Sequence, residues 1–133
     1  MTGIARAAVV AAGIFGFTGV AAGAFGAHAL KLRLDPEALA VFETAARYQL
    51  LHAPVLLGAA WVARQWPGRA ASASIVCFAL GIILFSGSLY ALSLSGLRLL
   101  GAVTPFGGLF LLLGWLLMAW AALAGPPARG THA

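Results

Sequence analysis

The sequence predicts an all-α membrane protein with four transmembrane helices and an amphipathic interfacial helix that leads into the second of them. The first observation is composition: 62% of the 133 residues are hydrophobic and 8% are charged, against about 25% charged residues in soluble domains. The second is the set of long uncharged runs, comparable with the ~20 residues that cross a hydrocarbon layer of ~30 Å. Too few charged side chains are present to cover a soluble core, so lipid must solvate part of the surface.

Charged residues and turn signals divide this single membrane domain, residues 1–133, into its expected helices. Asp35 followed by Pro36 is a helix start signal, and Thr104 followed by Pro105 repeats it. Gly68 ends the helix that begins at Pro36. We expect spans at 6–27, 46–65, 70–94 and 105–124, with the interfacial helix at 36–45.

The first apolar run can also be interpreted as a secretory signal, because Ala27 and Ala29 flank His28 in an A-x-A pattern. The run is longer than the ~7 to 15 residues of a signal core, and it is rich in glycine. We therefore expect it to be a retained first helix.

Glycines in this first helix predict a close-packing face. Gly16, Gly19, Gly23 and Gly26 fall within an arc of about 80° at 100° per residue. Small residues let membrane helices approach closely and gain dispersion contacts. We expect this face to meet a neighbouring helix, either within the protomer or across a dimer.

Polar residues gather where the first and second spans are expected to meet the interface. Thr44, Tyr48 and His52 share one stripe at i,i+4 spacing, and Glu43 is placed to pair with Arg47. Pro54 should bend the helix close to His52. The candidate cluster comprises His28, Glu43, Thr44, Arg47, Tyr48, Gln49 and His52.

Two interpretations of this cluster stay open. Ionisable groups inside a membrane are costly, which makes them candidates for proton relay, quinone contact or metal ligation. The same side chains could instead anchor the interface and join the first helix to the second. Two histidines without a carboxylate or thiolate at ligand spacing are a poor metal signal, so we expect no metal or other cofactor.

The remaining motifs argue against an enzyme and against nucleic-acid binding. No nucleophile elbow, phosphate loop or paired carboxylate constellation occurs, and the eight Lys and Arg residues are spread thinly along the chain. The serines at 86, 88, 93 and 95 are expected to bond to their own helix or to a neighbouring helix, with a pore lining as the alternative.

Several segments resemble a known family: GAFGAH at 23–28, FETA at 42–45, RYQ at 47–49, HA at 52–53 and GAVTPFGG at 101–108. They are similar to the domain-of-unknown-function 423 family of YgdD-like bacterial inner-membrane proteins, whose eukaryotic relative is called transmembrane protein 256. The resemblance covers nearly the whole chain and implies a compact multi-pass protein of the bacterial inner membrane. It implies no known activity, and it adds Thr104 to the candidate cluster.

From these observations we expect an integral membrane protein that acts as a non-enzymatic accessory or assembly protein of a membrane complex. Its expected partners are the lipid bilayer and either a membrane-protein partner or further copies of itself. Two alternatives stay open. One is an oligomer that lets a small solute or proton permeate, and the other is a quinone-linked or redox-linked membrane subunit.

Overall fold

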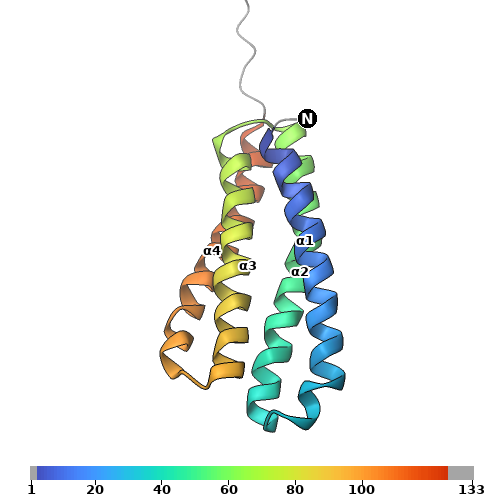
Figure 1. The fold of residues 1–133 in the computed structure, drawn as a ribbon. Helices are drawn as coiled ribbons and strands as arrows, with labels where there is room; N and C mark the ends of the chain where they lie inside the picture. Colours follow the sequence, from blue (N-terminus) through green and yellow to red (C-terminus); the bar gives the residue numbers. More distant parts are fainter. Residues whose placement is uncertain (1–2, 126–133) are drawn as a thin grey trace, which may run out of the picture.

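The computed structural model describes residues 3–125, which form long antiparallel helices joined by short connections (Figure 1). The protein is an all-α integral membrane protein, as the composition predicted. In chain order the elements are α1 (Gly3–His28), η1 (Leu30–Leu32), α2 (Pro36–Gln65), α3 (Arg69–Ser95), η2 (Arg98–Ala102) and α4 (Thr104–Ala124).

The helix boundaries follow local chemistry at most of the predicted positions. The Asp35 side chain accepts a hydrogen bond of 2.9 Å from the Ala38 amide and caps α2. Gly96 ends α3 with φ of 73°, a left-handed conformation that glycine adopts at little cost. The predicted Thr104 cap is wrong: α4 begins at Thr104 itself, and its hydroxyl bonds to Ser88 on α3 instead of an α4 amide.

Three segments of the described chain are long and apolar enough to cross a membrane: Gly3–Leu32, Arg69–Ser95 and Arg98–Ala124. The helix α2 is equally long, with 30 residues, but it carries charged side chains along its length. It is continuous from Pro36 to Gln65, so no break separates residues 36–45 from residues 46–65.

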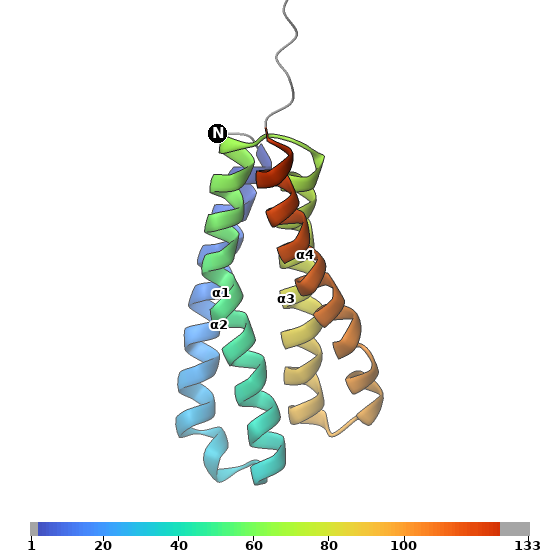
Figure 2. The same cartoon turned by 180° about the vertical axis from the view of Figure 1, so that it is seen from behind.

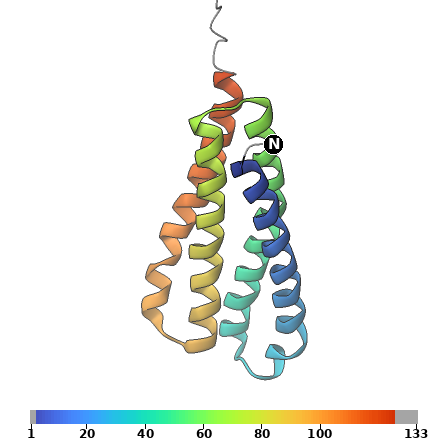
Figure 3. The ribbon, with the colours of Figure 1, turned by 45° about the horizontal axis from the view of Figure 1, so that its top comes forward.

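Each helix packs mainly against its neighbours in the sequence. Contacts are extensive between α1 and α2, between α2 and α3, and between α3 and α4, whereas no Cα atom of α1 lies within 8 Å of a Cα atom of α4 in the described chain. The hairpins α1–α2 and α3–α4 converge at the end that holds the α2–α3 connection and move apart toward the other end (Figures 1, 2 and 3). The result is an open bundle in which α2 and α3 are central.

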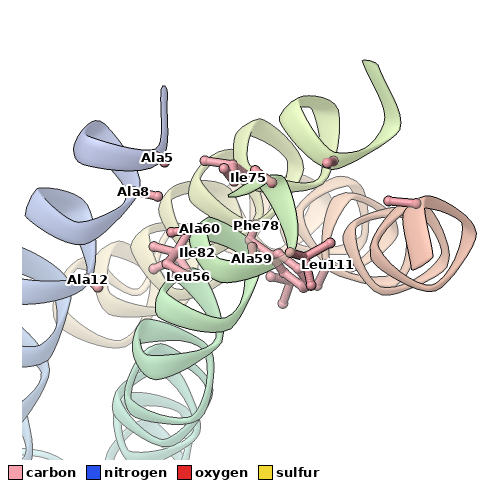
Figure 4. Close-up of a cluster of buried hydrophobic side chains, with 14 residues drawn as sticks. Ala5, Ala8, Ala12, Leu56, Ala59, Ala60, Ile75, Phe78, Ile82 and Leu111 are labelled. Carbon is pink, nitrogen blue, oxygen red and sulfur yellow. The ribbon is translucent and has the colours of Figure 1, made fainter. Parts of the chain in front are cut away.

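The apolar core occupies the converging half of the bundle (Figure 4). Alanines of α1 and α2 let these helices approach closely, and the larger Leu56, Phe78, Ile82 and Leu111 fill the space toward α3 and α4. Because this cluster closes only one half, α1 and α4 are free to lean outward in the other half.

Glycines lie at close contacts between α1 and α2 and at tighter contacts between α3 and α4. A Cβ on Gly19 would meet the Leu50 side chain at 2.9 Å, and one on Gly26 would meet Phe42 at 3.0 Å. No such neighbour lies within 4 Å of Gly16 or Gly23, so two of the four predicted glycines contact α2 closely.

The close approach between α3 and α4 was not predicted from the sequence. A Cβ on Gly107 of α4 would collide with the backbone of Phe85 on α3. Gly81 of α3 makes room for the Leu111 side chain, and Gly114 of α4 makes room for Phe78. Small residues therefore determine how near α4 can lie to α3.

Candidate functional site

Gln49 joins three helices near the middle of the bundle. Its Nε2 donates to the Phe15 carbonyl at 2.9 Å and to the Thr18 hydroxyl at 2.7 Å, both on α1. Its Oε1 accepts from the Tyr90 hydroxyl of α3 at 2.8 Å. The side chain is only 5% exposed, so its polar atoms depend on these partners.

Two serines of α3 extend this polar crossing to the neighbouring helices. Ser86 donates to the Ala45 carbonyl of α2 at 2.8 Å, and Ser88 shares a hydrogen bond of 2.7 Å with Thr104 of α4. Ser93 and Ser95 bond to carbonyls of their own helix, as expected. The Ser86 and Ser88 hydroxyls thus connect α3 to α2 and to α4.

His52 links α2 to α4 on the other side of the central helices. Its Nδ1 lies 2.9 Å from the Tyr48 carbonyl, and its Nε2 lies 3.3 Å from the indole Nε1 of Trp115. A carbonyl and an indole N–H fix the roles of the two ring nitrogens: Nδ1 donates and Nε2 accepts. This pattern is that of a neutral imidazole.

Aromatic rings surround His52. The Tyr48 ring is stacked on it with centroids 6.0 Å apart, and Tyr48 also lies 4.5 Å from the ring of Phe85. Trp115 contacts both His52 and Phe78 in edge-to-face geometry, at 6.1 and 5.3 Å. Such pairs favour a rigid arrangement.

The outward lean of α1 and α4 leaves two clefts that open sideways. The α1–α3 cleft has a volume of about 880 Å³ and holds Gln49, Ser86 and Tyr90 among mostly apolar residues. The α2–α4 cleft has a volume of about 630 Å³ and is lined by Tyr48, His52 and Trp115, among others. The polar crossing therefore borders one cleft and the aromatic group borders the other.

The other predicted site residues lie outside these groups. Glu43 and Arg47 are exposed on the outer surface of α2, and Thr44 donates to the Ala40 carbonyl one turn earlier. The predicted ion pair is wrong, because Glu43 and Arg47 do not approach within 4 Å in the described chain. An exposed pair at this spacing gains only ~0.3 to 0.5 kcal/mol, too little to hold two long side chains together.

His28 is separated from His52. It is exposed at the end of α1, where the adjacent Gly26 packs on Phe42. Phe42 precedes His52 by roughly 15 Å along α2. The two histidines therefore do not form one site.

The sequence interpretation missed several partners of Gln49 and His52. Trp115, Tyr90 and Thr18 come from α4, α3 and α1, and each lies more than 30 residues from its partner in the sequence. Polar atoms buried in an apolar helix indicate that partners exist. Only the packing of the helices shows which ones.

Comparison with known proteins agrees with the resemblance in the sequence. A family model described as "Protein of unknown function (DUF423)" matches residues 22–108. No solved structure matches this chain.

Relatives occur in distant bacteria. The chain is 43% identical over 113 residues to the UPF0382 inner membrane protein YgdD of Escherichia coli strain K12, which covers 85% of this chain and 86% of that protein. It is 39% identical over 105 residues to the UPF0382 membrane protein SH2409 of Staphylococcus haemolyticus, covering 74% and 80% respectively. The chain belongs to the DUF423 family of multi-pass membrane proteins, a family of unknown function whose enterobacterial members are named inner membrane proteins.

Proposed function

We propose that this protein is a non-enzymatic accessory or assembly protein that binds a larger membrane protein through the outer face of α2. In this proposal α2 crosses the bilayer as the second of four spans. The outer face of α2 comprises Glu43, Arg47, Leu51, Pro54, Gly58 and Trp61, all of which are exposed.

The supporting observation is the direction of the two charged side chains. Helical periodicity puts Arg47 roughly opposite Gln49, so it points away from the bundle while Gln49 points into it. Charged side chains in membrane helices usually face the bundle interior or pair with each other. Glu43 and Arg47 do neither in the described chain, and a partner with complementary charges would supply the missing contacts.

The apolar surface beside Glu43 and Arg47 supports the proposal that this face of α2 lies against lipid. Gly26 of α1 packs on Phe42, which brings Glu43 to the level of Phe25 on α1. Phe25 is 52% exposed, and Leu51 on α2 is 58% exposed. The charges thus lie beside apolar surface that favours hydrocarbon, where an unpaired carboxylate or guanidinium is costly.

Copurification of the tagged full chain in mild detergent tests the proposal. We expect a stoichiometric membrane-protein partner with the unmodified chain and its loss with Arg47→Gln. The matched control is Arg69→Gln, which removes an exposed arginine at the converging end of the bundle. Equal recovery with both variants, or no partner after gentle crosslinking, would contradict the proposal.

A double exchange separates loss of contact from altered membrane insertion. Glu43→Arg combined with Arg47→Glu keeps the net charge of α2, so the balance of charges that directs insertion is unchanged. We expect this variant to insert normally and to lose its partner, because the order of charges is reversed.

A further inference from the structure

We propose that the α2–α4 cleft binds a membrane quinone, that is, a flat ring with carbonyl oxygens and an apolar tail. This site is separate from the outer face of α2, and the inference does not rest on the accessory role. The cleft lies where α2 and α4 make few contacts, and it opens sideways between two helices of the bundle. A ligand must therefore enter from the bilayer and must partition into hydrocarbon.

The walls of the cleft suit a flat ring. Tyr48, Phe85 and Trp115 contribute aromatic surfaces, while Pro105 and Gly108 of α4 leave room between them. Rings in such surroundings stack or meet edge to face, which stabilises an added ring beyond the area that it buries. The volume of about 630 Å³ is within the range of small-molecule sites, about 300 to 1,000 Å³.

The hydrogen-bonding groups of the cleft favour a ligand that accepts. The Tyr48 hydroxyl has no hydrogen-bond partner among residues 3–125. The Trp115 N–H has only a long contact of 3.3 Å with His52. Both groups can donate to an oxygen, and a quinone carries carbonyl acceptors and no donor.

The α1–α3 cleft provides an internal comparison. It is larger, but its Gln49, Ser86 and Tyr90 side chains already form hydrogen bonds of 2.7 to 2.9 Å within the protein. A ligand that only accepts hydrogen bonds would gain no new one from these groups, because their donor hydrogens are already used. Of these two clefts, the α2–α4 cleft is the one that combines aromatic walls with a donor that lacks a partner among residues 3–125.

Tryptophan fluorescence can measure binding directly, because Trp115 lines the cleft. The full chain in phosphatidylcholine nanodiscs is titrated with decylubiquinone, a short-tailed quinone. We expect quenching that saturates, and we expect Trp115→Phe to remove the saturable part while the other three tryptophans keep a weak linear response. Linear quenching that is identical in both proteins would overturn the proposal.

Two variants connect the binding to the cleft. Tyr48→Phe removes only the free hydroxyl and should weaken binding about fivefold, the effect of one hydrogen bond of ~1 kcal/mol. Tyr90→Phe is the matched control, since its hydroxyl is bonded to Gln49 outside this cleft, and it should leave the affinity unchanged. Gly108→Leu fills the cleft and should abolish saturable quenching. Circular dichroism and size-exclusion profiles identify any variant that fails to fold.

A ring-free competitor tests whether the cleft accepts any lipid chain. Methyl decanoate has an ester carbonyl and a chain of similar length but no ring. We expect it to leave decylubiquinone quenching nearly unchanged at equal concentration. Equal competition would show that the cleft holds an acyl chain and would overturn the quinone assignment, as would unchanged affinity in Tyr48→Phe.

Discussion

The Tyr90 hydroxyl on α3 donates to the Gln49 side-chain oxygen on α2 over 2.8 Å, while the nitrogen of the same Gln49 amide donates to two oxygens of α1. One side chain therefore connects three helices at the level where the hairpins begin to separate. It restrains the α1–α3 cleft at its base. Without it, α1 would lose these two hydrogen bonds to α2, while the Ser86 hydroxyl would still join α3 to the Ala45 carbonyl of α2.

Replacing Gln49 with Leu should lower the free energy of unfolding by about 1 to 3 kcal/mol, because three interhelical hydrogen bonds are lost. Unfolding in mixed micelles measures the change. Gln65→Leu is the control, since Gln65 is exposed at the end of α2 and should have little effect. A double-mutant cycle with Tyr90→Phe should give a coupling near 1 kcal/mol, and additive effects would contradict a direct bond.

Gly107→Ala should destabilise the protein by about 1 to 3 kcal/mol, because its Cβ would press on the backbone of Phe85 and push α4 from α3. The adjacent Gly108 is a sensitive control. A Cβ there would lie 3.8 Å from the Phe85 ring, an ordinary contact, so Gly108→Ala should be tolerated. Thermal unfolding in detergent should separate the two variants, and equal midpoints would argue against this packing.

Asp35→Ala should lower the free energy of unfolding by about 1 kcal/mol, because the first turn of α2 loses the side chain that bonds to the Ala38 amide. Asp35→Asn retains an oxygen acceptor and should stay close to the unmodified protein. Amide hydrogen exchange at the start of α2 provides a local measurement. Faster exchange in the Asn variant than in the Ala variant would contradict the capping role.

His52 should carry its proton on Nδ1, since Nδ1 faces the Tyr48 carbonyl and Nε2 faces the Trp115 N–H. Nitrogen-15 spectra of the imidazole distinguish the two tautomers. Trp115→Phe should shift the Nε2 resonance, because it removes the N–H donor, and should affect Nδ1 much less. A proton on Nε2 in the unmodified protein would rule out this arrangement.

Local signals predicted the helices well because they act within a few residues. The Asp35 cap depends on one short segment, as does the break near Gly68, which lies between the end of α2 at Gln65 and the start of α3 at Arg69. Thr104 is the exception. Its hydroxyl could bond to an α4 amide or to Ser88 on another helix, and only the position of α3 decides between them.

The candidate site was predicted less completely, because its groups meet through helix packing. Tyr48, Gln49 and His52 could be identified on one helix, yet they face different neighbours. Helical periodicity separates them by angle without identifying what lies opposite. The glycines gave a similar result: Gly16 and Gly19 look alike in the sequence, but only Gly19 has Leu50 next to it.

The packing of each helix mainly on its sequence neighbours has a consequence for how the protein is made. Synthesis releases the helices in the same order in which they pack, so α2 can pair with α1, and α3 with α2, before α4 exists. Because few contacts join helices that are not consecutive, each helix can pack on the preceding one before the next is made. The bundle can therefore assemble progressively during translation, with α4 added last through the glycines that fit it against α3.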